Sequence, residues 1–168
     1  TTIGSRTVDK IRQVQFDWGT GSRICFVDGV NPAVIFDGLN WYELRQANTG
    51  GTSSPGGDQL TDAPSIVAEY QNHLWVGGDL TSRATLYHSH TDDPYSWSAT
   101  VGVEGGGGYL SPAFNVVQIK PFRDDLFVFG TNSIKKITNT APGVFPIKSV
   151  TSNVGCIARD SVTEIAGD

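Results

Sequence analysis

The chain has 168 residues, enough for one sizeable domain whose core needs no disulfide or metal. Its net charge is −5, and an acidic surface gains no affinity from releasing phosphate counterions, which disfavours a protein that grips nucleic acid. No run of about 20 apolar residues is present, so we expect a soluble protein without membrane insertion by this segment. Methionine is absent, even at position 1, so we expect a processed product or a fragment of a longer chain.

The composition predicts an all-β fold. The chain has 20 Gly and 8 Pro, and no window of more than about ten residues keeps the apolar spacing of an amphipathic helix without Gly or Pro. In the first part of the chain we expect strands at 7–16, 23–27, 33–36 and 41–44. They are separated by Asp28-Gly29 and Asp37-Gly38, dipeptides that favour tight hairpins.

An internal repeat of about fifty residues follows. Residues 65–77 match residues 117–129: both contain an alternating strand, an aromatic residue, a polar turn and a Leu-aromatic-Val strand. Leu126 lies 52 residues after Leu74, and Ile24 lies 50 residues before Leu74. The remaining strands of the second and third repeats are predicted at 84–88, 95–98, 133–137 and 145–149.

Four short antiparallel strands per repeat are typical of a propeller blade. We therefore predict a single β-propeller-like sector over residues 1–168, with about three blades and a partial fourth. The predicted blades cover residues 7–45, 63–99 and 114–150, and the start of a fourth covers 154–168, with its opening strand at 161–165. Because closed propellers contain four to eight blades, a longer chain or another copy would have to complete the ring.

Neither the cysteines nor the glycine-rich segments indicate a binding site. Cys25 and Cys156 lie in apolar, strand-like stretches and are interpreted as buried free thiols. The segments 50–57 and 105–108 lack the Lys-Ser or Lys-Thr and the helix start that a phosphate-binding loop needs. We interpret both segments as flexible loops between blades.

A metal site is the strongest polar hypothesis. On an extended strand His88, His90 and Asp92 would point to one side and could converge on a metal ion. The segment continues into Pro94 as a turn, however, and the third histidine, His73, is predicted in another turn. A solvated loop is the favoured interpretation, and we expect no metal or other cofactor.

Hydrolase chemistry is also disfavoured. Six acidic residues are candidates for a pair of catalytic carboxylates: Asp17, Asp28, Asp37, Glu69, Asp79 and Glu104. Most lie in predicted turns, where Asp is common for local hydrogen bonding, and their spacing selects no pair. Residues 89–97 only faintly match the sialidase blade signature, and no Gly-x-Ser-x-Gly elbow occurs. We expect no enzyme and no catalytic residue.

The four tryptophans recur about once per blade edge, at Trp18, Trp41, Trp75 and Trp97. A propeller uses such residues mainly to fill the wedge between sheets, which is the favoured interpretation. A platform on which carbohydrate stacks would use them as well, and this alternative stays open.

Residues 122–134 and then 153–162 resemble the propeller core of phage tail nozzle proteins, also called tail tubular protein B or packaged-DNA stabilisation protein, of short-tailed bacteriophages. In that family an R-D/N-x-L-x-V-F-G strand, an S-I strand and a Gly-centred segment recur in this order. Residues 27–38 and 83–97 are similar to preceding blades. The family's proteins are several times longer and carry platform and tip domains that are absent here.

The resemblance implies a structural virion protein, assembled in the host cytoplasm and located in the phage tail. It implies a homohexameric ring beneath the head–tail adaptor, with tail fibre proteins as further partners and a channel that retains double-stranded DNA and conducts it at ejection. An acidic lumen suits transient, non-specific passage of DNA, because it repels phosphates. Two alternatives stay open, a carbohydrate- or protein-binding propeller module and a hydrolase on the same scaffold.

Overall fold

The computed structural model describes residues 10–18, 21–44, 60, 63–97 and 106–163. These residues form three four-stranded antiparallel sheets and one short 3-10 helix, η1 (Arg159–Ser161). The predicted all-β fold is therefore confirmed. Strands that are consecutive in the chain are neighbours in each sheet, so every sheet is a simple meander.

The first sheet has the strand order that the hairpin signals predict. It consists of β1 (Arg12–Asp17), β2 (Ser22–Val27), β3 (Val34–Phe36) and β4 (Trp41–Glu43). The β3–β4 turn contains Gly38 at a φ of +97°, a conformation that a residue without Cβ adopts readily. In the same turn, the Asp37 carboxylate accepts hydrogen bonds from the backbone N–H groups of Leu39 and Asn40.

The second sheet differs from the prediction in its last strand. It consists of β5 (Ile66–Tyr70), β6 (His73–Gly77), β7 (Leu86–His88) and β8 (Gly108–Leu110). The predicted strand at 95–98 is wrong for residues 95–97, while Ser98 lies outside the described residues. This segment folds back on itself, because the His90 N–H bonds the Ser96 carbonyl and the fully buried Trp97 indole bonds the Pro94 carbonyl.

The third sheet repeats the second. It consists of β9 (Gln118–Phe122), β10 (Asp125–Phe129), β11 (Ile134–Thr138) and β12 (Ile147–Thr151). The expected last strand at 145–149 begins two residues later, and a register shift between Ile134 and Lys135 interrupts its pairing with β11. Both β6 and β10 are second strands of their sheets, as the repeat predicts.

The predicted opening strand of a fourth blade is wrong for residues 161–163. Ser161 belongs to η1, and residues 162–163 form no strand; residues 164–165 lie outside the described part. Hydrogen bonds of Arg159 and Asp160 hold this segment against the starts of β1, β5 and β9.

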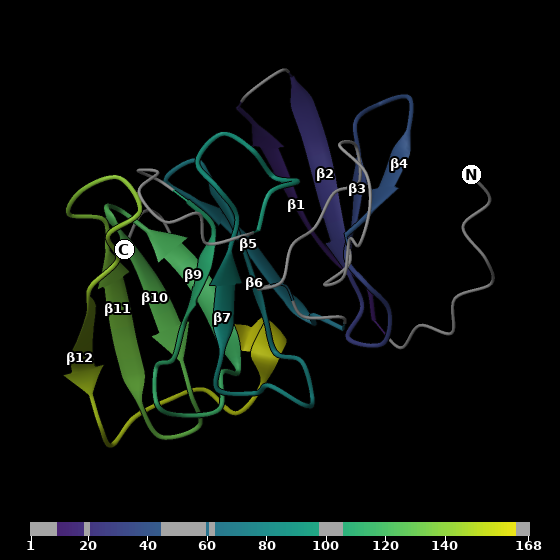
Figure 1. Ribbon diagram of the computed structural model, residues 1–168. Coiled ribbons are helices and arrows are strands. Elements are labelled where there is room, and N and C mark those ends of the chain that lie inside the picture. Colours follow the sequence, from purple (N-terminus) through teal and green to yellow (C-terminus); the bar gives the residue numbers. More distant parts are fainter. Residues whose placement is uncertain (1–9, 19–20, 45–59, 61–62, 98–105, 164–168) are drawn as a thin grey trace.

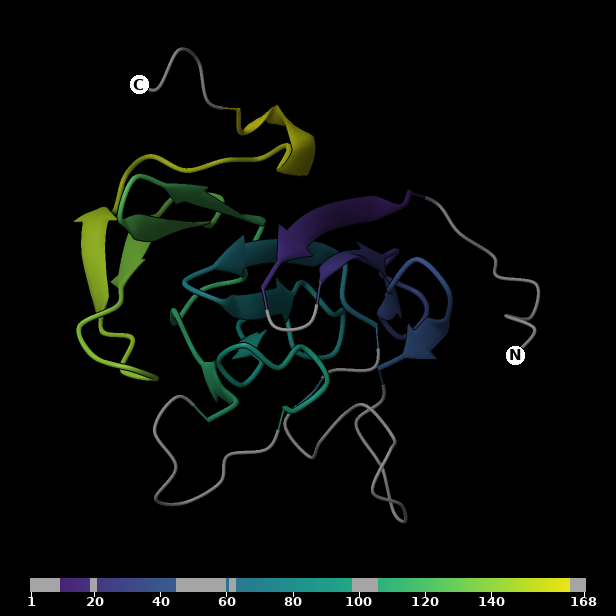
Figure 2. The ribbon, with the colours of Figure 1, turned by 90° about the horizontal axis from the view of Figure 1, so that it is seen from above.

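The three sheets lie side by side in chain order, with the second in the middle (Figures 1 and 2). One apolar core fills the space between the first and second sheets, and another fills the space between the second and third. The first strands of consecutive sheets are neighbours, since β1 contacts β5 and β5 contacts β9.

Candidate functional site at the open sheet faces

The second sheet is covered on both sides, as the burial of its strand β6 shows. All five residues of β6 are buried. Leu74 and Val76 pack in the core shared with the first sheet, while Trp75, between them, packs in the core shared with the third. Alternate residues of a strand point to opposite faces, so one strand contributes to both cores.

The third sheet is covered on one side only. Leu126 and Val128 of β10 are fully buried against the second sheet. On the opposite face, Phe127 and Phe129 are only partly buried, and Val150 of β12 is 50% exposed. Among the residues that the structure describes, no sheet packs against this open face.

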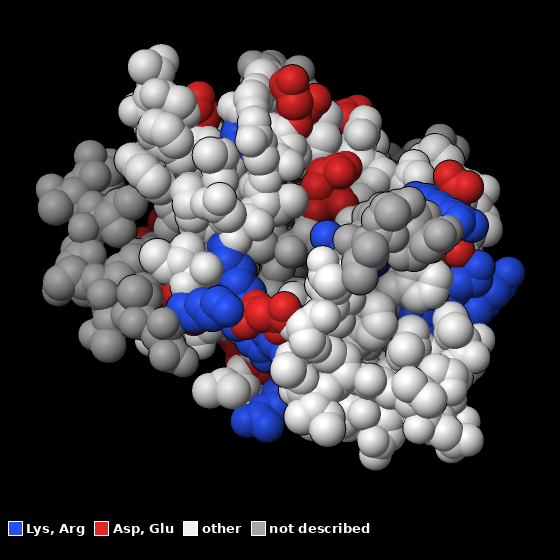
Figure 3. All heavy atoms as spheres, turned by 180° about the vertical axis from the view of Figure 1, so that it is seen from behind, with Lys and Arg blue, Asp and Glu red and all other residues white. Residues whose placement is uncertain are grey.

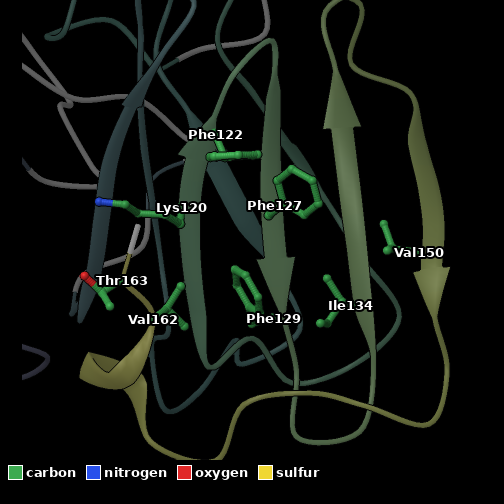
Figure 4. Close-up of a pocket in the computed structure, with 8 residues that line it drawn as sticks. All are labelled: Lys120, Phe122, Phe127, Phe129, Ile134, Val150, Val162 and Thr163. Atoms are coloured by element: carbon green, nitrogen blue, oxygen red, sulfur yellow. The ribbon is translucent and has the colours of Figure 1, made fainter. Parts of the chain in front are cut away.

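A shallow hollow of about 310 Å³ lies on this face (Figure 4). Its lining comes from all four strands and from the segment after η1: Lys120, Phe122, Phe127, Phe129, Ile134, Val150, Val162 and Thr163. Six of these eight side chains are apolar. The hollow offers apolar area without a converging set of polar groups, which suits packing better than chemistry.

The repeat relates this face to a buried one. At an offset of 52 residues, Phe122 corresponds to Tyr70 and Phe127 corresponds to Trp75. Tyr70 is 4% exposed and Trp75 is fully buried, both in the core between the second and third sheets. The open face of the third sheet therefore has the same kinds of residues as the face of the second sheet that packs against the third.

Among the described residues, no sheet packs against the opposite side of the first sheet, which is called its open face. Cys25, Val27 and Ile35 face the second sheet, so alternation places Ile24, Phe26, Val34, Phe36 and Trp41 on the open face, where Val34 is nevertheless only 3% exposed. The Trp41 ring stacks on Phe36 at a centroid distance of 4.5 Å and lies 5.7 Å from Phe26. Trp41 is 43% exposed, so the prediction that the tryptophans fill the core is wrong for this one.

The prediction holds for Trp75 and Trp97, which are both fully buried. Trp18 is partly buried and packs against the core between the first and second sheets. The burial of the tryptophans thus differs with their position. Trp75 and Trp97 lie in the cores between sheets, whereas Trp41 lies on a face that no described sheet covers.

The two open faces differ in charge. On the third sheet, strand pairing places Lys120, Lys136 and Lys148 on the open face together with Asp125. Lys136 bonds Asp125 at 2.6 Å, and this hydrogen bond is the main reason that the pKa of Asp125 is lowered.

The open face of the first sheet has the opposite balance. Its strands place Asp17 and Glu43 there, and no Lys or Arg of β1–β4 lies on that face. Elsewhere, basic and acidic side chains lie next to one another between large uncharged areas, as on the rear face in Figure 3.

The segment around η1 ties the first strands together. The Asp160 carboxylate accepts hydrogen bonds from Arg12 of β1 at 2.9 and 3.0 Å and from Lys10 at 2.6 Å. The Arg159 guanidinium donates to Ser65, which precedes β5, and to the carbonyl of Val117, which precedes β9. Short-range motif reasoning misses this contact, because the partners lie 42 to 150 residues apart in sequence.

His88, His90 and Asp92, the residues of the disfavoured metal hypothesis, do not come together. Within the described part of the chain, no group of three or more His, Cys, Asp and Glu side chains could hold a metal ion. His88 is buried against Trp75 and Phe145, the His90 ring bonds the Thr91 carbonyl, and Asp92 accepts from Asn72.

Two details of the histidine prediction are wrong. His88 ends β7, inside the predicted strand at 84–88, but it is 5% exposed, so the solvated interpretation is wrong for this residue. His73 begins β6 and is 1% exposed, with its ring bonded to the Ser89 carbonyl and the Thr91 hydroxyl. Burial lowers the pKa of His73. The pKa of His88 is lowered to about 4, mainly by burial and in addition by the nearby His73.

The acidic residues mostly serve their own turns, as predicted. Asp28 accepts from Val30 and Asn31, and Asp79 accepts from Thr81 and from the backbone N–H of Ala63. Apart from the bond between Ala63 and Asp79, which are 16 residues apart, these are local bonds of the kind that position a turn. Asp37 and Glu69 cap turns in the same way, Asp17 is exposed, and Glu104 lies outside the described residues.

Both cysteines are buried and form no disulfide, as predicted. Burial raises the pKa of the Cys25 thiol far above its usual range, which makes it unreactive in the folded chain. The glycine segment 50–57 lies outside the described residues. In the segment 105–108 the loop prediction is wrong for Gly108, which begins β8.

Comparison with protein-family models gives no match, and no curated protein matches the chain. In the described part of the chain, no helix is long and apolar enough to cross a membrane.

Proposed function

We propose that the chain is a structural sector of a β-propeller without catalytic activity, and that it forms part of the tail nozzle of a short-tailed bacteriophage. The propeller part of this proposal is supported by the arrangement of the three meander sheets. They pack face to face in chain order, and their first strands are neighbours. In a propeller, each sheet packs face to face on the next and the first strands surround a central channel.

The absence of a site for chemistry supports a structural role. Among the described residues, the acidic side chains mostly hold turns, and the histidines lie in a buried aromatic cluster or a turn. The hollow on the open sheet face is mainly apolar. Enzymes bring titratable groups together in a cleft. Within the described residues, no group of three or more His, Cys, Asp and Glu side chains could hold a metal ion.

The tail nozzle role rests on the resemblance of residues 122–134 and 153–162 to that family. In this role the chain contributes to a six-fold ring below the head–tail adaptor, touches tail fibre proteins, and lets double-stranded DNA pass at ejection. The net charge of −5 supports passage over binding, because an acidic wall repels phosphates.

Two experiments test this function. Mass spectrometry of purified phage particles from the source of the sequence should detect peptides of this chain, such as those around residues 122–134. A gel-shift titration with non-specific duplex DNA at about 50 mM salt should give no retention. Absence of the peptides from intact particles would contradict the virion role, and sub-micromolar, salt-sensitive DNA binding would contradict the DNA-repelling wall.

One observation favours the second candidate, a carbohydrate-binding module. Trp41 is 43% exposed and already stacked on Phe36, which is the arrangement of an aromatic platform for a sugar ring. A glycan array separates the two functions. Binding that is lost in Trp41→Ala would favour the carbohydrate module over the nozzle.

A further inference from the structure

We propose that Arg12, Arg83 and Arg159 form an anion-binding site, whose ligand is a small organic molecule with a carboxylate or phosphate group. The site is a pocket at the ends of strands from all three sheets, away from the open sheet faces. The inference therefore depends neither on what covers those faces nor on the tail nozzle role.

The pocket has a volume of about 440 Å³. Its walls come from the start of β1, the segment between β6 and β7, the segments that flank β9 and β10, and the segment that leads into η1. Parts of the chain that are far apart in sequence thus meet around one hollow. Its volume lies within the range of about 300–1,000 Å³ that is typical of pockets for small molecules.

Two of the arginines are held in place by other residues of the chain. The Asp160 carboxylate accepts hydrogen bonds from Nε and Nη2 of Arg12 at 2.9 and 3.0 Å. Arg159 donates from Nε to the Val117 carbonyl and from Nη1 to the Ser65 hydroxyl. Because these bonds fix both guanidinium groups before a ligand arrives, binding costs little side-chain freedom.

Arg83 supplies the third guanidinium group. Its side chain is exposed and forms no hydrogen bond or ion pair with the residues that the structure describes. Its backbone carbonyl accepts a hydrogen bond from the Val116 N–H at 2.8 Å, which fixes this wall of the pocket. A guanidinium group has more N–H donors than the two bonds that Arg12 and Arg159 each make, so all three arginines retain donors for a ligand.

The pocket is positively charged, although the whole chain has a net charge of −5. Its lining contains three arginines and, within the described part of the chain, no Asp or Glu. The single negative charge of Asp160 is shared between Arg12 and Lys10. Burial and, in addition, the nearby charge of Arg12 lower the pKa of Arg159, although the group stays protonated at neutral pH. An anion in the pocket would offset this repulsion between the arginines.

One further carboxylate lies near the pocket without lining it. Asp79 stands between Gly78 and Leu80, which both line the pocket. Its oxygens accept hydrogen bonds from the backbone N–H groups of Ala63 and Thr81 and from the Thr81 hydroxyl. These bonds hold the carboxylate in its own turn.

The remaining lining indicates an organic ligand and not a bare ion. Leu80, Val116, Val117 and Ile157 contribute apolar groups, and Leu80 and Ile157 are 69% and 88% exposed. A ligand with an anionic group at the arginines and an apolar part beside these residues would bury apolar area on both sides. Guanidinium forks bind carboxylate and phosphate with the same geometry, so either group satisfies the site.

The first measurement is isothermal titration calorimetry of the protein that contains these residues, in chloride buffer. Citrate tests a carboxylate ligand and AMP tests a phosphate ligand. At least one of them should bind saturably, with a Kd of about 1 mM or less. Inorganic phosphate should bind at least about 5-fold more weakly than the better of the two, because it makes no apolar contact.

The second measurement assigns the binding to the pocket. Arg83→Gln should weaken the binding at least about 10-fold, because a charge-assisted hydrogen bond is lost, and Arg83→Lys should recover only part of it. Arg83 is exposed and unpaired among the described residues, so both variants should fold. Arg123→Gln is the matched control, since it removes the same charge from the β9–β10 turn at the other end of β9 and should leave the affinity unchanged.

Three results would overturn the inference. The first is the absence of saturable binding of both citrate and AMP, which would also follow if another part of the protein filled the pocket. The second is an equal affinity in Arg83→Gln and the unaltered protein. The third is inorganic phosphate binding as tightly as the organic anions. Since no phage component or DNA is present, each result leaves the nozzle role to its own experiments.

Discussion

The guanidinium of Arg159 donates a hydrogen bond to the hydroxyl of Ser65, 94 residues earlier in the chain. A second bond, at 2.9 Å, reaches the carbonyl of Val117. One side chain thus joins the residues that precede β5 and β9, the first strands of two different sheets. The neighbouring Asp160 carboxylate accepts a hydrogen bond from Arg12 of β1, the first strand of the remaining sheet.

Arg159→Ala should lower the free energy of unfolding by about 1–2 kcal/mol, since hydrogen bonds from a charged donor are lost and the group is only partly buried. Arg159→Lys should recover little of this, because an ammonium group cannot reproduce the fork that reaches both partners. Urea unfolding followed by tryptophan fluorescence measures the change. Lys148→Ala, at an exposed lysine, is the control, and an equal loss there would contradict the role of Arg159.

Trp75→Ala should be much more destabilising than Phe127→Ala, although the two residues are equivalent in the repeat. Trp75 is fully buried between two sheets, so its truncation should cost about 3–5 kcal/mol. Phe127 is only partly buried, so its truncation should cost about half as much or less. Both variants are compared by urea unfolding at the same protein concentration. Equal losses would mean that both faces of the third sheet are covered.

The stability of the chain should fall as the pH is lowered from about 6.5 to about 4. The folded-state pKa of His88 is depressed to about 4 by burial and by His73, so the unfolded chain binds a proton that the folded chain excludes in this range. The free energy of unfolding should therefore decrease toward acid pH by up to about 3 kcal/mol. Unfolding in urea at several pH values measures this slope.

The control for this pH dependence is His88→Asn, which removes the titrating group. The variant should lose most of the slope between neutral and acid pH, while the smaller part that comes from His73 remains. An unchanged slope would assign the acid sensitivity to other groups. A carboxylate such as Asp160, whose pKa is lowered by Arg12 and Lys10, would contribute mainly below this range.

Local signals in the sequence predicted the hairpins and the repeat well. Asp28-Gly29 and Asp37-Gly38 mark real turns, and the 52-residue offset correctly pairs β6 with β10. The errors arise where contacts between residues far apart in the sequence determine the local structure. Residues 95–97 alternate like a strand, but burial of Trp97 and its bond to Pro94 hold them in a loop, and β8 comes from a glycine-rich segment with weak strand preference.

The open faces were beyond prediction for a related reason. Trp75 and Phe127 occupy the same position in strands of similar pattern, and nothing within either strand tells that one is covered and the other exposed. Burial depends on whether another sheet follows in space. The offset of 52 residues contained the missing signal, because it shows that the exposed face is built from residue types that are otherwise buried.

The one-way packing of the sheets also bears on how such a chain could change over generations. Among the described sheets, the second contacts the first through one face and the third through the other. A tandem duplication of one period of about fifty residues would insert a sheet that meets both neighbours with faces they already accept. The length of this chain could therefore grow in whole repeats, whereas an insertion of half a period would leave a core exposed.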